Sequence, residues 1–113
     1  MIDVIFHIDE LSKWNLLLKN VQNLINALDN ENFHIEVLAN SEAVKFYLGS
    51  SSDSDYHLLA DLTGLGVQFT ACNNALEGFG IQHEQLPRFV LVVPAGVLEL
   101  IEKQHQGYAY IKP

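Results

Sequence analysis

Cys72 is the only cysteine in this 113-residue chain and the residue best suited to nucleophilic chemistry. It directly follows an apolar run, residues 67–71, that predicts a β-strand, and it precedes a segment that can begin a helix. A thiol at a helix N-terminus meets free backbone N–H groups and the positive end of the helix dipole, and both favour the reactive thiolate. The next residues, Asn73 and Asn74, offer amide donors for a sulfur anion or a bound oxyanion. The alternative is a structural Cys72, because free cysteines are among the most buried residue types.

Three further candidate residues follow the ends of other predicted strands. His7 lies at the end of the first strand, Asn40 directly after the second, and Gly96 in the Pro-Ala-Gly turn after the fourth. Ligands of open α/β sheets bind beyond the carboxyl ends of the strands, so these residues are expected to line a pocket with Cys72. Each has a structural alternative as well. His7 can be a hydrogen-bonded residue of the fold, and Asn40 can cap the short helix that follows it.

Other chemistry has weaker support in the sequence. His7 and Asp9 form a third hypothesis, a small-molecule enzyme, but nothing in the sequence shows that the two side chains face each other. No Cys/His cluster, His-x-x-x-His spacing or paired-carboxylate motif predicts a metal site. Cys-x-x-Cys, Gly-x-Ser-x-Gly and the glycine-rich phosphate-binding motifs are also absent. No metal or cofactor is therefore expected.

Strands and helices alternate along the chain. Apolar, β-branched runs predict strands at residues 2–8, 33–39, 67–71, 89–93 and 108–112. Apolar periodicity and turn residues predict helices near 14–28, 42–48, 55–63 and 97–105, with shorter turns at 73–80 and 82–86. Such alternation implies parallel pairing through right-handed crossovers. We expect one domain, residues 1–113, of the α/β class: a three-layer α/β/α sandwich with a mainly parallel five-stranded sheet.

Three segments carry finer expectations. Polar and apolar residues alternate over 33–39, which predicts an outer strand with one face less buried. Residues 89–93 are continuously apolar, which predicts a strand covered on both faces. The serine-rich stretch at 49–54 predicts an exposed, conformationally variable loop.

Composition excludes several classes of partner. The chain has 6 Lys and Arg against 14 Asp and Glu, a net charge of −8. Nucleic acids and anionic membrane surfaces attract basic proteins, so neither is an expected partner. No apolar run is long enough to span a membrane, and the first residues resemble a strand more than a signal peptide. A single cysteine cannot form an internal disulfide, which favours the reducing cytoplasm.

Several segments in combination are similar to those of the small DsrE/DsrF-like proteins. The matching segments are Phe-His-Ile-Asp-Glu at 6–10, Glu-Val-Leu-Ala-Asn at 36–40, Ala-Cys-Asn-Asn at 71–74, Val-Pro-Ala-Gly-Val at 93–97 and Gly-Tyr-Ala-Tyr at 107–110. The resemblance covers essentially the whole chain. It implies an α/β/α fold, assembly into homo-oligomers such as trimers or hexamers, and a cysteine that carries sulfur as a persulfide between donor and acceptor proteins. Cys72 is the position that matches this cysteine.

Two main hypotheses follow. In the first, the chain is a sulfur-handling, sulfurtransferase-like protein in which the Cys72 thiolate accepts a sulfane sulfur and passes it on. In the second, it is a non-catalytic homo-oligomeric binding or assembly module in which Cys72 is structural.

Overall fold

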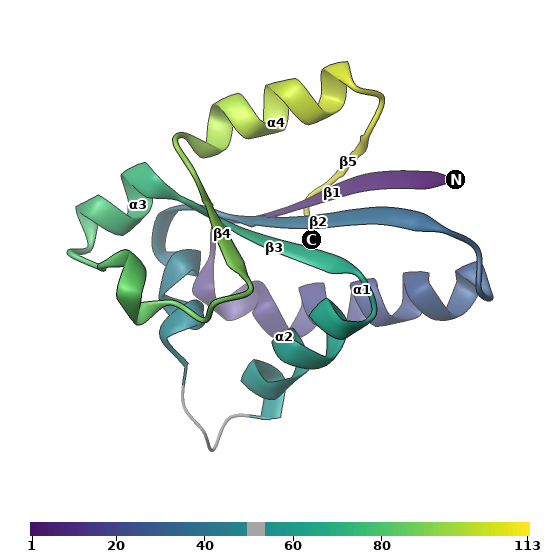
Figure 1. Ribbon diagram of the computed structural model, residues 1–113, viewed down its shortest axis with the longest axis horizontal. Coiled ribbons are helices and arrows are strands. Elements are labelled where there is room, and N and C mark those ends of the chain that lie inside the picture. The colour runs from purple at the N-terminus through teal and green to yellow at the C-terminus, as the bar shows by residue number, and fades with distance from the viewer. Residues whose placement is uncertain (50–53) are drawn as a thin grey trace.

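A five-stranded, all-parallel sheet forms the centre of the protein in a computed structural model that describes residues 1–49 and 54–113 (Figure 1). The strand order is β4-β3-β2-β1-β5. The strands are β1 (Ile2–Ile8), β2 (Phe33–Ala39), β3 (Val67–Cys72), β4 (Val90–Val93) and β5 (Ala109–Ile111). The predicted α/β class and parallel five-stranded sheet are confirmed. Most of the serine-rich loop predicted at 49–54 lies outside the described residues.

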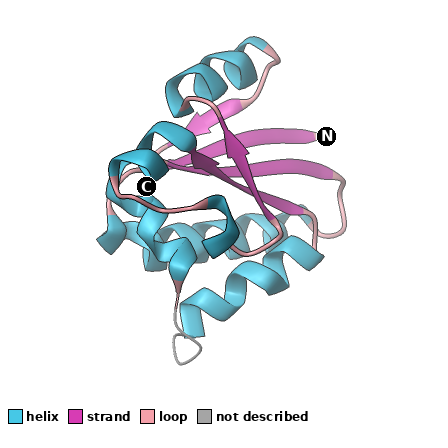
Figure 2. Cartoon of the chain, turned by 60° about the vertical axis from the view of Figure 1, so that its left-hand side comes forward, coloured by secondary structure: helices cyan, strands magenta, loops and turns pink. Residues whose placement is uncertain are grey.

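Helices cover both faces of this sheet (Figure 2). The α-helices are α1 (Trp14–Leu28), α2 (Ser54–Gly64), α3 (Asn73–Gly78) and α4 (Gly96–His105). Three 3-10 segments accompany them, η1 (Leu11–Lys13), η2 (Ser41–Leu48) and η3 (His83–Gln85). Figure 1 shows α1 and α2 on one side and α4 on the other, which completes the three predicted layers. Within residues 1–49 and 54–113, no helix has the length and apolar character needed to cross a membrane.

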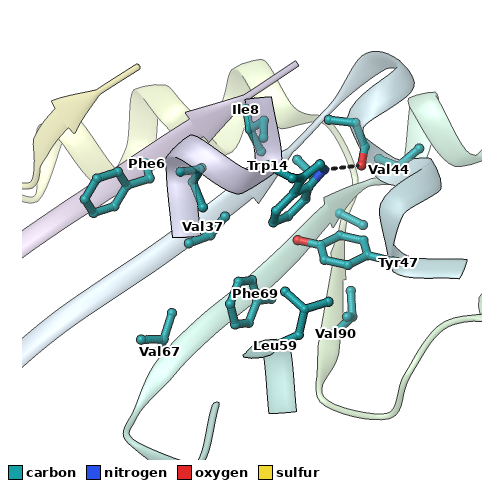
Figure 3. Packing of buried hydrophobic residues seen from close by; sticks show 14 of the residues in the cluster. Phe6, Ile8, Trp14, Val37, Val44, Tyr47, Leu59, Val67, Phe69 and Val90 are labelled. Atoms are coloured by element: carbon teal, nitrogen blue, oxygen red, sulfur yellow. Dashed lines mark hydrogen bonds between the residues drawn. The ribbon is translucent and has the colours of Figure 1, made fainter. Parts of the chain in front are cut away.

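The apolar core lies between the sheet and the layer of α1, η2 and α2 (Figure 3). Trp14, at the start of α1, is buried against Tyr47 and Phe69, and its indole Nε1 donates to the carbonyl oxygen of Ala43 at 3.0 Å. The Tyr47 hydroxyl donates to the carbonyl oxygen of Thr70 at 2.9 Å. These two bonds satisfy the polar atoms of large buried side chains and hold η2 against α1 and β3.

Strand β2 was expected at the outside of the sheet, and this prediction is wrong, because β2 pairs with β1 on one side and β3 on the other. Its alternating residues His34, Glu36 and Leu38 point to the second face of the sheet, where only His34 is exposed. Helix α4 covers this face, so the alternation reflects burial beneath a partly polar helix and not contact with water.

Strand β4 was expected to be covered on both faces, and this prediction is also wrong. β4 is an edge strand, and Leu91 at its middle is 50% exposed. The chain turns from β4 into α4 at Gly96, and α4 reaches β2, where the Lys103 ammonium meets Glu36. The continuous apolar run of β4 therefore has an uncovered side within the single chain.

Glu36 is a buried carboxyl group between the sheet and α4, and only 2% of it is exposed. Its Oε2 accepts a hydrogen bond of 3.0 Å from the Thr70 hydroxyl, and its Oε1 lies 3.7 Å from the Lys103 ammonium. Burial is the main reason that the pKa of Glu36 rises from 4.5 to about 8, and the neighbouring carboxyl of Glu99 on α4 raises it further. Thr70 and Lys103 act in the opposite direction but only partly compensate. At neutral pH Glu36 is therefore mainly a neutral acid beneath α4.

This raised pKa predicts a stability that falls as pH rises. The folded state binds a proton at Glu36 that the unfolded chain releases, so the stabilisation is complete below pH 4.5 and is lost as pH rises through about 8. Denaturant unfolding across this range should show the wild type losing on the order of a few kcal/mol relative to Glu36→Gln, whose amide does not titrate.

Glu102→Gln is the matched control, because Glu102 is exposed on the same helix. It should leave the pH dependence of the wild type unchanged. Parallel stability curves for the wild type and Glu36→Gln would show that Glu36 is not protonated in the folded protein.

Candidate functional site

The register of the three central strands brings their carboxyl ends together. Ile8 of β1 pairs with Ala39 of β2, which pairs with Ala71 of β3. Asn40 and Cys72 are the next residues along β2 and β3, so they leave the sheet side by side. Neighbouring side chains at one level of a parallel sheet share a face. This pairing is why residues 32 positions apart in the sequence meet at one edge of the sheet.

Cys72 is the last residue of β3 and directly precedes α3, so its predicted position at a strand end before a helix is confirmed. Its Sγ accepts a hydrogen bond of 3.3 Å from the backbone N–H of Gly96, the first residue of α4. The first N–H groups of a helix have no acceptor within the helix, so this one is free to bind sulfur. Only 7% of Cys72 is exposed, which restricts access to small or slender reactants.

Gly96, the first residue of α4, lies in contact with the residues at the ends of β2 and β3. A Cβ atom at this position would stand 3.4 Å from the Cβ atoms of both Asn40 and Cys72, and 3.5 Å from the Asn40 Nδ2. The backbone at Gly96 therefore packs directly between these two side chains. Three of the predicted site residues, Cys72, Asn40 and Gly96, form one contact.

His7 joins this group through Asn40. Its Nε2 lies 3.0 Å from the Asn40 Oδ1, and its Nδ1 lies 2.7 Å from the hydroxyl of Tyr110 on β5. Asn40 is the N-cap residue of η2, as the alternative predicted, but its side chain makes no capping hydrogen bond there. The amide faces His7 because β1 and β2 pair in register: His7 stands opposite Leu38, two residues before Asn40 and on the same face.

The structure places the two remaining predicted residues differently. Asn73 lies on α3, where its Oδ1 meets the His83 Nε2 at 2.8 Å and its Nδ2 donates to the Glu77 Oε1 at 3.1 Å. Asn74 is exposed on the same short helix. The side-chain amide of Asn73 is thus engaged with α3 and η3 rather than with the Cys72 sulfur.

Asp9 does not join the group around His7. Its carboxylate lies 3.4 Å from the Lys112 ammonium, while both ring nitrogens of His7 are engaged by Tyr110 and Asn40. The structure therefore gives no support to an enzyme that uses a His7–Asp9 pair. Among the described residues, no three His, Cys, Asp or Glu side chains come together as a metal site.

Tyr110 is the residue of this site that the sequence analysis did not select. The signal for it was indirect, because β5 was predicted but its neighbour in the sheet was not. Once β5 pairs with β1, Ile5 stands opposite Tyr110, and His7 follows on the same face. Only the strand order, with β5 beside β1, reveals this contact.

Comparison with known proteins agrees with this fold. The model of the DsrE/DsrF-like family matches residues 7–113. A solved protein of unknown function from Methanobacterium thermoautotrophicum is 38% identical, with full coverage of both chains and a TM-score of 0.87. The ychN protein of E. coli shares the fold at 18% identity, with full coverage of both chains and a TM-score of 0.75. No curated protein matches the chain. With a matching family model over nearly its whole length, this chain belongs to the DsrE/DsrF-like family.

Proposed function

We propose that this protein carries sulfane sulfur on Cys72 as a persulfide, in intracellular sulfur metabolism. Membership of the DsrE/DsrF-like family supports a role related to sulfur metabolism. The observation that carries the specific proposal is the hydrogen bond from the Gly96 N–H to the Cys72 Sγ. A free N–H at the start of a ten-residue helix is a donor suited to an anionic sulfur.

The proposed chemistry needs neither a metal nor an oxidant. The Cys72 thiolate attacks the outer sulfur of a donor persulfide, and a new S–S bond forms while the S–S bond of the donor breaks. The electron pair of the broken bond leaves with the donor as its thiolate. The proton of the donor persulfide stays on the transferred sulfur, so Cys72 becomes a persulfide. An acceptor thiolate then attacks this outer sulfur and releases the Cys72 thiolate, which makes the protein sulfurtransferase-like.

Limited access suits this role. A terminal sulfur at the end of a persulfide is slender, and the 7% exposure of Cys72 admits it more readily than a bulky oxidant. Burial also protects a bound persulfide from unrelated thiols in the solvent. The donor and acceptor proteins would then have to present their sulfur at the edge where β2, β3 and α4 meet.

Sulfur loading of Cys72 is the direct test. Glutathione persulfide serves as the probe, and intact mass spectrometry follows the gain of one sulfur atom per chain. We expect the wild type to load faster than N-acetylcysteine in the same solution, because Gly96 stabilises the sulfur anion.

Cys72→Ser is the control, and it should stay unmodified while it keeps the wild-type fold by circular dichroism. A wild-type thiol that loads more slowly than N-acetylcysteine would overturn the proposal. That result would favour the alternative of a binding or assembly module in which Cys72 only packs.

We also propose that the protein is a homo-oligomer, a trimer or a hexamer as its family membership suggests. Helix α4 turns the polar residues Glu99 and Lys103 toward Glu36 in the sheet. Its apolar residues Val97, Leu98 and Ile101 point outward. Together with Leu91 of the edge strand β4 they form the apolar α4 surface, whose four side chains are 47–66% exposed. An exposed apolar helix face that points away from the sheet of its own chain is typical of an interface between protein chains.

A charge on this apolar α4 surface should break the assembly. Leu98→Glu is expected to lower the molar mass measured by light scattering to that of one chain, because the carboxylate would be buried without a partner. Leu16→Glu, on an exposed apolar position of α1, is the control and should leave the mass unchanged. A wild-type protein with the mass of one chain would refute the oligomer.

A further inference from the structure

The hydrogen bonds around His7 have a defined direction. The Asn40 Oδ1 can only accept a hydrogen bond, so the His7 Nε2, 3.0 Å away, carries the hydrogen. In a neutral imidazole the other nitrogen is then an acceptor. The Tyr110 hydroxyl, 2.7 Å from the His7 Nδ1, must therefore be the donor of that bond. Hydrogen bonds thus run from Tyr110 to His7 and from His7 to Asn40.

Asn40, the last residue in this series of hydrogen bonds, lies next to Cys72. With its oxygen toward His7, the Asn40 amide turns its nitrogen away, and the Nδ2 is 3.5 Å from the point where a Cβ of Gly96 would stand. The same point is 3.4 Å from the Cβ of Cys72. The NH₂ group of Asn40 therefore lies on the side of the amide that borders Gly96 and Cys72.

The opposite arrangement is unfavourable at this position. It would turn the amide oxygen of Asn40 toward Cys72, where the Gly96 N–H is already engaged with the sulfur. A carbonyl oxygen beside an anionic sulfur repels it, whereas an NH₂ group can donate to it. With the NH₂ group toward Cys72, the Tyr110 hydroxyl donates to the His7 Nδ1, and His7 donates to Asn40.

We propose that Tyr110 is a positioning residue for the Cys72 site. Through His7 it orients the Asn40 amide, so that the Asn40 NH₂ and the Gly96 N–H together form a two-donor site for the Cys72 thiolate that accepts and releases sulfur. This inference rests on the proposed function for its chemical purpose. Its structural part, the direction of the two hydrogen bonds at His7, can be tested without any sulfur transfer.

The tautomer of His7 tests the structural part. Nitrogen-15 NMR of neutral His7 should show the hydrogen on Nε2 in the wild type. Tyr110→Phe removes the donor to Nδ1 and should yield a mixture of both tautomers. Tyr108→Phe is the matched control and should leave His7 unchanged, because Tyr108 stacks on His34 instead. A hydrogen on Nδ1 in the wild type, or an unchanged Tyr110→Phe spectrum, would overturn the inference.

Loading with glutathione persulfide tests the two-donor site. Asn40→Asp keeps the acceptor for His7 but removes the NH₂ donors, and we expect loading to slow by about tenfold or more. Tyr110→Phe should slow loading less, because the amide can still adopt the productive orientation part of the time. His7→Gln, whose side-chain amide can still donate to Asn40, should load faster than His7→Phe.

The outcomes separate the two proposals. If the wild type does not load, the persulfide function is overturned, and so is the proposed role of Asn40 as a donor to the sulfur. The tautomer spectra still decide whether Tyr110 directs the hydrogen bonds at His7. If the wild type and Asn40→Asp load at the same rate, the proposal of a two-donor site is overturned, while the proposed persulfide function stands.

Discussion

The hydrogen bond between the Gly96 N–H and the Cys72 Sγ is the interaction on which the candidate site depends. It joins the end of β3 to the beginning of α4, and it requires that the chain pass directly from β4 into the helix. The backbone at Gly96 also packs against both Asn40 and Cys72, so that the three residues form one contact. Parallel pairing supplies the rest, since it places all strand ends at one edge of the sheet.

The two faces of the sheet are built differently, and this difference explains the position of α4. One face is apolar and is covered by α1, α2 and η2. The other face carries polar side chains, among them Glu36 and Thr70, which are buried. A helix that packs on such a face must present polar groups to it, and Lys103 and Glu99 do so. The apolar residues of α4 are left to point outward, which is the physical origin of the apolar α4 surface.

Sequence patterns predicted most elements well, because strand and helix periodicity is a local property. The strands at 2–8 and 33–39 have the predicted bounds, and the cysteine stands at the predicted junction of strand and helix. The errors concern which strands lie next to each other in the sheet and what covers them. An alternating strand was predicted at the edge of the sheet and lies near its centre, whereas the continuous apolar strand was predicted to be covered and lies at the edge. Alternation shows that two faces differ in polarity, but it does not show whether water or a polar helix covers the polar one.

Sequence by itself determined the fold class and which residues stand at the strand ends, because the order of elements implies parallel pairing and parallel pairing aligns those ends. It also singled out Cys72, His7, Asn40 and Gly96 as candidates. Only the tertiary structure decided their contacts. The strand order brought Tyr110 to His7, the register set Asn40 against His7, and the path of α4 brought the Gly96 N–H to the sulfur. These contacts join segments up to 103 residues apart, and local periodicity carries no information about which distant segments become neighbours.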